Sequence, residues 1–236
     1  MFSLLRQRLL IIAPHPDDEV LGCGGLIHRI KSLGGKVYVL FLTMGTTADY
    51  SKSGISTSSS RRKEIIKVMK FLNVDDYDIA FPGNKYHLKL DSLPSLEIIN
   101  MIEKKSKVSV NKIRPTVIAT TQITDYNQDH RTAAKSTIAV LRPAPHDLKQ
   151  FIPLVLGYEF AANSWNIINP QSPNFYISLQ KKDLSAKIKA MHLYKSQTRA
   201  GSHTRSSSTI NSLAKLRGAQ CGSFAAEAYY CYRFYL

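Results

Sequence analysis

The chain has 236 residues, of which 44% are hydrophobic, so it is long and apolar enough for a substantial core and is not globally disordered. No apolar run approaches the roughly 18 residues of a membrane-spanning helix, so no membrane span is expected. The formal net charge of +15 favours anionic partners, such as phosphorylated or nucleotide-linked molecules, nucleic acid or acidic lipid. A solvated basic surface without a specific partner is an equal alternative.

The cysteines are few and odd in number, and Cys23, Cys221 and Cys231 form no Cys-x-x-Cys motif. This usage is typical of a reducing compartment rather than of a disulfide scaffold, so we expect a cytoplasmic protein. The first apolar run leads directly into polar residues at His15 and lacks a small-residue cleavage site. We therefore expect a strand there rather than a signal peptide.

Apolar runs and helical spacings alternate along the chain. Short apolar runs predict strands at 9–15, 36–45, 77–83, 116–121 and 151–160. Helices are expected at 19–35, 61–72, 92–107, 129–142 and 181–195. The Ser/Thr-rich stretch 46–60 is expected to be a loop. No repeat or linker divides the chain, so we expect one domain over 1–236 whose last forty residues cover part of the same core.

This alternation predicts an α/β fold with a Rossmann-like, mostly parallel sheet and helices on both faces. Ligands bind such sheets at the carboxyl ends of the strands. Polar clusters follow two of the expected strands, "HPDD" at 15–18 and "TDYNQDH" at 124–130. The glycines at 22–25 lack the spacing of a dinucleotide-binding loop, and we expect them to let a helix pack closely on the sheet.

The two polar clusters predict a metal site if their strand ends are neighbours. His15, Asp18 and His130 would then supply two imidazoles and one carboxylate, which suits catalytic zinc with an open fourth position. Iron(II) would suit the same ligands. Asp17 would remain free of the metal and able to take a proton from a nearby water molecule. The alternative is that these acids only cap the helices that follow.

At this point a family resemblance is evident. "PHPDDE" at 14–19, followed by a glycine-rich helix start, resembles the signature of the LmbE-like (PIG-L) zinc-dependent N-deacetylases. The resemblance covers nearly the whole chain and includes "RRKE" (61–64), "NQDHR" (127–131), "YKSQ" (194–197), "HTRS" (203–206) and "AEAY" (226–229). It implies an LmbE-like fold and hydrolysis of the acetamide of a GlcNAc-type amino sugar, free, nucleotide-linked or within a glycan or glycoside.

The resemblance also implies roles for individual residues. The zinc ligands would be His15, Asp18 and His130, and Asp17 would be the general base. Asp129 would orient a nearby imidazole.

The same resemblance implies two substrate contacts, and this chain departs from the family pattern at one position. Arg61 and Arg205 would contact substrate or product. Many relatives have a histidine three residues before the second zinc histidine, whereas this chain has Asn127, which donates a hydrogen bond but cannot shuttle a proton. Either Asp17 makes both proton transfers or another group substitutes, and His203 is the candidate.

Other functions are compatible with the same sequence. The enzyme would be an amidase acting on another acyl-amino compound, such as a thiol-sugar conjugate or an antibiotic precursor, or the chain would bind sugars without catalysis. A nucleic-acid-binding module is disfavoured because no binding motif occurs. The expected partner is a small amino-sugar substrate, anionic if the basic surface contributes, and a homo-oligomer is compatible with the sequence.

Overall fold

A seven-stranded sheet in the order β5-β2-β1-β6-β7-β9-β8 forms the centre of the computed structural model, which describes residues 3–48, 54–145, 148–165 and 171–235. The strands are β1 (Arg8–Ala13), β2 (Lys36–Met44), β5 (Asp76–Pro82), β6 (Val117–Thr120), β7 (Leu154–Tyr158), β8 (Phe175–Leu179) and β9 (Ala225–Phe234). The neighbours from β5 to β7 pair in parallel, and β9 runs antiparallel to both β7 and β8. The expected mostly parallel sheet is confirmed.

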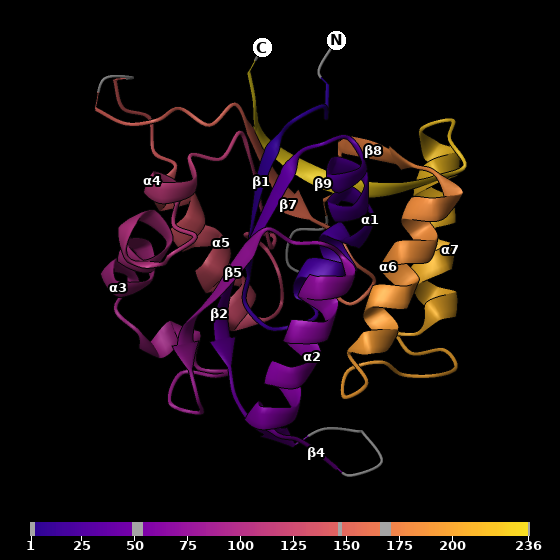
Figure 1. The fold of residues 1–236 in the computed structure, drawn as a ribbon, viewed down its shortest axis with the longest axis horizontal. Coiled ribbons are helices and arrows are strands. Elements are labelled where there is room, and N and C mark those ends of the chain that lie inside the picture. Colours follow the sequence, from indigo (N-terminus) through magenta and orange to yellow (C-terminus); the bar gives the residue numbers. More distant parts are fainter. Residues whose placement is uncertain (1–2, 49–53, 146–147, 166–170, 236) are drawn as a thin grey trace.

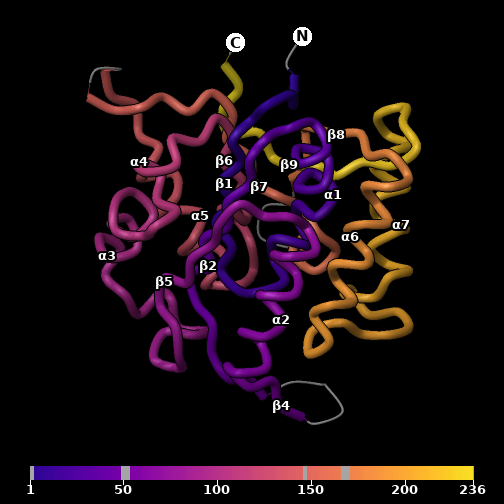
Figure 2. The backbone as a smooth tube through the Cα atoms, viewed as in Figure 1, coloured from indigo at the N-terminus to yellow at the C-terminus, as the bar shows by residue number. Residues whose placement is uncertain are grey.

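Helices cover both faces of this sheet, as expected (Figure 1). They are α1 (Asp18–Ser32), α2 (Ser58–Phe71), α3 (Ser95–Asn100), α4 (Val110–Ile113), α5 (Gln128–Val140), α6 (Lys181–Leu193) and α7 (Ser207–Gln220). Two separate apolar clusters lie on the two sides, one under α1, α2 and α6 and one under α3 and α5. Although far apart in sequence, α1 and α6 pack side by side (Figure 2). In the described ranges, no helix is both long and apolar enough to cross a bilayer.

Three segments differ from the expected elements. The helix expected at 92–107 is α3 followed by a π-helical turn, Met101–Lys105. The expected loop at 46–60 contains the short strands β3 (Thr47–Ala48) and β4 (Ile55–Ser56), and its residues 49–53 lie outside the described ranges. Helix α2 begins before Arg61, because the hydroxyl of Thr57 accepts a hydrogen bond from the backbone N–H of Ser60 (3.1 Å) and caps it.

The carboxyl-terminal part of the chain supplies elements that we did not predict. These are β8, α7 and β9, and β9 lies inside the sheet between β7 and β8. Its buried Glu227 accepts hydrogen bonds from the backbone N–H groups of Gly25 and Leu26 in α1 (both 2.8 Å) and from Lys187 Nζ (2.7 Å). The end of the chain therefore completes the sheet and supports α1.

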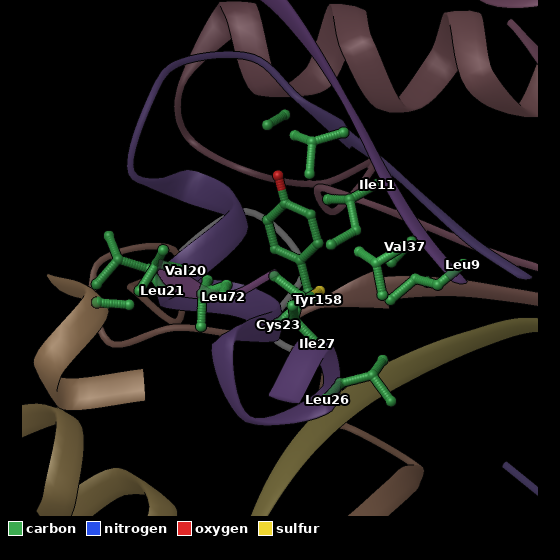
Figure 3. Close-up of a cluster of buried hydrophobic side chains, with 14 of the residues drawn as sticks. Leu9, Ile11, Val20, Leu21, Cys23, Leu26, Ile27, Val37, Leu72 and Tyr158 are labelled. Atoms are coloured by element: carbon green, nitrogen blue, oxygen red, sulfur yellow. The ribbon is translucent and has the colours of Figure 1, made fainter. Parts of the chain in front are cut away.

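Glycines bring α1 into close contact with its surroundings, as expected. The ring of Tyr158, fully buried in the core shown in Figure 3, occupies the space that a side chain at Gly22 would need. A Cβ atom at Gly25 would lie 2.6 Å from Leu179 Cδ1, and one at Gly24 would lie 2.9 Å from Lys187 Cγ. These positions fix the distance between α1 and the elements that it covers.

We predict that Gly22→Ala lowers the free energy of unfolding by about 1–3 kcal/mol, because the new methyl group overpacks the core against Tyr158. The higher helix propensity of alanine offsets only part of this loss. Ser32→Ala, at an exposed position of the same helix, is the control and should change stability by less than about 0.5 kcal/mol. Equal denaturant midpoints for the two variants would contradict the close contact.

Candidate metal centre and catalytic site

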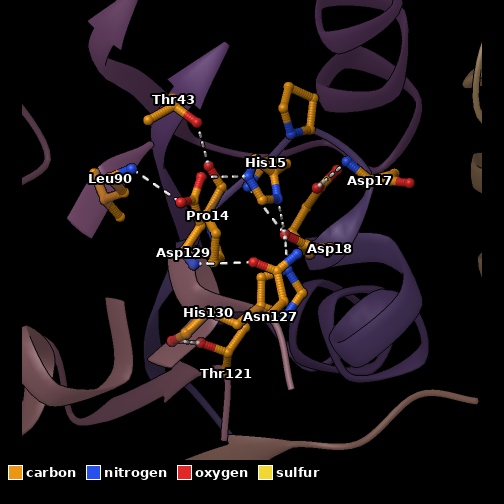
Figure 4. Close-up of polar contacts among 12 residues, drawn as sticks. Pro14, His15, Asp17, Asp18, Thr43, Leu90, Thr121, Asn127, Asp129 and His130 are labelled. Carbon is orange, nitrogen blue, oxygen red and sulfur yellow. Dashed lines mark hydrogen bonds and ion pairs between the residues drawn. The ribbon is translucent and has the colours of Figure 1, made fainter. Parts of the chain in front are cut away.

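The candidate site lies where two neighbouring parallel strands end. β1 and β6 pair directly; the carboxyl end of β1 leads into the loop that carries His15, and that of β6 leads into the loop before α5. Helix α1 begins at Asp18 immediately after the first loop, and α5 carries His130 in its first turn. The two polar clusters of the sequence therefore meet at one edge of the sheet (Figure 4).

Three buried side chains converge on one point there. Asp18 Oδ2 lies 3.4 Å from His15 Nδ1 and 3.4 Å from His130 Nε2. One ligand atom from each residue lies within 4.8 Å of the other two. Two imidazole nitrogens and a carboxylate oxygen that face each other in this way fit a divalent metal ion with room for a further ligand.

Two outer carboxylates hold the imidazoles in this orientation. Asp129 Oδ2 lies 2.9 Å from His15 Nε2, and Asp125 Oδ2 lies 2.8 Å from His130 Nδ1. Asp125 is itself fixed, because its Oδ1 accepts a hydrogen bond from the backbone N–H of Asn127 (2.9 Å). With these partners the neutral imidazoles carry their protons on the outer nitrogens, and the inner nitrogens are free to bind metal.

The three residues shift one another's pKa values: the imidazoles lower the pKa of the Asp18 carboxyl, and the carboxylates raise the pKa values of His15 and His130. Burial opposes charge on Asp18, but His130 and His15 nevertheless hold the pKa of Asp18 well below its usual range. Burial also opposes charge on His130, while Asp18 and Asp125 raise the pKa of His130 to about 10. A metal must displace the imidazole protons, so metal affinity is expected to fall as the pH falls.

The capping alternative holds for Asn127 but not for Asp17. Asn127 Oδ1 accepts a hydrogen bond from the backbone N–H of Asp129 (2.9 Å) and so caps α5. Asp17 occupies the N-cap position of α1, yet its side chain makes no capping hydrogen bond. Its backbone has φ of 115°, a left-handed conformation that is strained for a residue other than glycine.

The carboxylate of Asp17 is buried beside an arginine. It is 1% exposed, and neither oxygen accepts a hydrogen bond from the described residues. Its Oδ2 lies 3.0 Å from Arg205 Nε. Burial raises the pKa of Asp17, and the Arg205 guanidinium opposes that rise. Asp17 is therefore a carboxylate whose proton affinity depends on its immediate neighbours.

The strained backbone of Asp17 is held by a buried pair that we did not predict. Glu19 Oε2 accepts a hydrogen bond from the backbone N–H of Asp17 (3.0 Å), and the hydroxyl of Tyr194 donates to Glu19 Oε1 (2.6 Å). Burial is the main cause that raises the pKa of Glu19 to about 8. Both residues lie in motifs that the family resemblance includes, "PHPDDE" and "YKSQ".

Arg61 and His203 lie differently from the residues of the cluster. Arg61 is buried and its Nη2 donates to the carbonyl oxygen of Pro16 (2.8 Å), so it supports the loop that carries Asp17. The backbone N–H of Arg205 donates to His203 Nδ1 (3.0 Å). His203 therefore contacts the segment that pairs with Asp17, and its described hydrogen bond does not lead to the metal cluster.

His87 is a neighbour of the site that sequence reasoning missed, since no motif surrounds it. Its ring lies edge-on to His15, with centroids 5.5 Å apart. His87 Nε2 lies 2.6 Å from Thr47 Oγ1, and Nδ1 lies 3.2 Å from Thr43 Oγ1. Burial, with a contribution from His15, lowers the pKa of His87 to about 3, so the imidazole is neutral. Asp125 was also missed, although it lies in the second polar cluster.

An α/β fold with a buried His–Asp–His set at the carboxyl edge of its sheet, and with a further buried aspartate next to it in the chain, is typical of metal-dependent hydrolases. The family model described as GlcNAc-PI de-N-acetylase, PIG-L, matches residues 10–141, more than half of the chain. The chain belongs to the PIG-L family, and it is a deacetylase of that family.

Curated relatives agree with this assignment. The uncharacterized deacetylase YaiS of Escherichia coli K12 is 27% identical over 193 residues, which cover 81% of this chain and 92% of that protein. The diacetylchitobiose deacetylase of Thermococcus kodakarensis is 32% identical over 107 residues, which cover 42% of this chain and 38% of that protein.

Solved structures share the fold. A conserved protein of Thermus thermophilus aligns with a TM-score of 0.73 and 24% identity, over 98% of this chain and 96% of its own. The A40926 pseudoaglycone deacetylase Dbv21 aligns with a TM-score of 0.71 and 18% identity, over 98% of this chain and 99% of its own. At these identities the likeness concerns the fold.

We predict that Asp125→Asn weakens metal binding by about 10- to 100-fold, because a neutral amide replaces the charged partner that orients His130. Binding should be measured by competition with a chromophoric chelator, with zinc and iron(II) in turn. Asp91→Asn, which changes an exposed carboxylate, is the control. Unchanged affinity in Asp125→Asn would show that the outer carboxylate does not support the metal site.

Proposed function

We propose that this deacetylase hydrolyses the acetamide of an N-acetylated amino sugar of the GlcNAc type and releases the free amine and acetate. The observation that carries the proposal is the convergence of His15, Asp18 and His130 on one point, with the buried Asp17 directly before Asp18 in the chain. The descriptions of the family and of the diacetylchitobiose deacetylase support the sugar as substrate class.

The residues present fit a divalent metal, and we propose that His15 Nδ1, Asp18 Oδ2 and His130 Nε2 hold zinc, with iron(II) as the alternative. When bound, such an ion polarises the amide carbonyl and makes a water molecule more acidic. Asp129 and Asp125 keep the two imidazoles in the tautomer that binds metal.

Asp17 would act as the general base towards the attacking water. Burial raises the pKa of its carboxylate and so its affinity for a proton, while the neighbouring Arg205 guanidinium opposes part of that rise. Glu19 fixes the backbone of Asp17 and thereby the direction of its carboxylate. Once protonated, Asp17 would return the proton to the departing amine nitrogen.

The remaining predicted residues would act on the substrate side. Arg205 is partly exposed and would contact the substrate as well as Asp17. Arg61 is buried behind the Pro16 carbonyl and would contact the substrate or product acetate only from the inner wall of the site. Asn127 uses its side-chain oxygen to cap α5, so only its amide N–H groups remain as donors towards the substrate. His203 is the alternative to Asp17 as the proton donor in the second transfer.

We also propose a cellular location, a substrate charge and a domain organisation. Cys23, Cys221 and Cys231 are all free thiols, which supports a reducing, cytoplasmic location. The net charge of +15 supports a substrate that carries an anionic group. The single seven-stranded sheet supports one deacetylase domain over 1–236.

We predict that Asp17→Asn lowers the rate of acetate release from N-acetylglucosamine compounds by at least about 100-fold, because the amide cannot accept the proton. Metal content should stay near that of the parent protein, since Asp17 is not a proposed ligand. Asp91→Asn again serves as the control. Acetate release at the parental rate by metal-loaded Asp17→Asn would contradict the assigned role.

The role of His203 has a separate test. If its imidazole assists proton transfer to the amine, His203→Ala should lower kcat by about 10- to 100-fold without changing metal affinity, and the lost rate should be partly restored by added imidazole. His192→Ala is a matched control, because His192 is an exposed histidine on α6. Near-normal turnover of His203→Ala would leave both proton transfers to Asp17.

A further inference from the structure

Two large aromatic side chains, Tyr126 and Trp165, lie together on the surface. Their ring centroids are 5.7 Å apart and the ring planes are inclined by 66°, an edge-to-face arrangement. Tyr126 is 50% exposed and Trp165 is 66% exposed. Two adjacent exposed rings offer an apolar face that a ligand can cover.

Both residues follow strands at the carboxyl edge of the sheet, where the metal cluster also lies. Tyr126 follows β6 and lies between Asp125 and Asn127 in the same loop. Trp165 ends the turn that follows β7, the direct parallel neighbour of β6. In that turn, Phe160 packs against the ring of His130 with centroids 6.0 Å apart. The loop before Tyr126 and the turn before Trp165 therefore both contact His130.

The backbone around each ring is fixed by specific hydrogen bonds. Arg131 Nη1 donates to the carbonyl oxygen of Tyr126 (2.6 Å). The fully buried Asn163 donates to the carbonyl oxygen of Tyr158 (3.1 Å) and accepts from the backbone N–H of Phe160 (2.8 Å), which closes the turn before Trp165. The two rings are thus presented by anchored loops, which reduces the entropy lost when a ligand is bound.

Charged residues of the site also affect the pKa of the Tyr126 hydroxyl. Burial raises the pKa of Tyr126, Asp125 and Asp18 add to the rise, and Arg205 opposes it. The geometry agrees, because Asp125, the residue before Tyr126, contacts His130 (2.8 Å), and Phe160 packs against the same imidazole. The aromatic pair therefore borders the proposed catalytic site.

Building on the proposed deacetylation, we infer that Tyr126 and Trp165 form a stacking platform for a second pyranose ring, joined to the sugar that carries the acetamide. The C–H face of a pyranose packs on aromatic rings, and the Tyr126 hydroxyl can bond a sugar hydroxyl. Polar residues that are not buried adjoin the rings in sequence, Asn127 after Tyr126 and Ser164 before Trp165. The surface thus suits a single sugar ring better than a long alkyl chain, and the preferred substrate is a disaccharide or longer glycan.

Fluorescence tests binding to this platform without depending on catalysis. Trp165 is the only tryptophan of the chain, so all tryptophan emission comes from the platform. N,N′-diacetylchitobiose should change the emission of the metal-loaded protein, in the parent and in Asp17→Asn, whereas N-acetylglucosamine should not at the same concentrations. A response to octyl N-acetylglucosaminide but not to the disaccharide would overturn the sugar platform and indicate an apolar substituent.

Kinetics test the consequence for specificity. Trp165→Ala should raise KM for N,N′-diacetylchitobiose by about 3- to 10-fold, with kcat unchanged and KM for N-acetylglucosamine unchanged. Trp165→Phe should recover most of the loss, and Leu216→Ala, at an exposed position on α7, is the control. An unchanged KM for the disaccharide would overturn the platform.

The two proposals fail in different ways. If no sugar releases acetate but the disaccharide still changes the Trp165 emission, the platform stands and the proposed reaction is wrong. If acetate is released equally well from both sugars and the emission stays constant, the reaction stands and the platform is wrong. If neither acetate release nor an emission change occurs, both are wrong.

Discussion

The close packing of α1 on its neighbours is the constraint on which the site depends. Helix α1 begins at Asp18, so a shift of this helix would move Asp18 away from His15 and His130. Gly22 lets α1 contact the ring of Tyr158 directly, and Glu227 of β9 binds backbone N–H groups in the middle of the helix. Core packing and a buried charge together therefore set the position of one proposed metal ligand.

The site concentrates negative charge in a buried place and compensates each charge locally. Asp18 lies between two imidazoles, whose outer nitrogens face Asp129 and Asp125, and Asp17 lies against Arg205. Such a network is costly when one partner is removed, because a buried charge is then left without compensation. The same dependence makes the arrangement specific, since each side chain has only one orientation that satisfies its neighbours.

The sequence predicted the parallel strands and the helices on both faces, because these depend on short-range apolar patterns. It also predicted that the two polar clusters meet, because ligand sites in such sheets lie at the carboxyl ends of the strands. It did not predict β9, whose buried Glu227 interrupts an apolar run and is stabilised by contacts with α1 and α6, far away in sequence. His87 was missed for a similar reason, since only the fold brings it to His15. By contrast, Asp125 lies in the second polar cluster and Glu19 lies in "PHPDDE". The sequence identified both segments, and only the side-chain directions in the structure show what these two residues contact.

The place of β9 in the sheet has a consequence for how the protein is made. β9 is the last strand of the sequence, yet it lies in the sheet's interior, and it is the strand with which β8 pairs. During synthesis the other six strands of this sheet therefore leave the ribosome before the sheet can close and α1 can bind Glu227. Pairings over such long separations form slowly, so the nascent protein exposes the open edges of β7 and β8 for a time, and this interval is where chaperones would act on it.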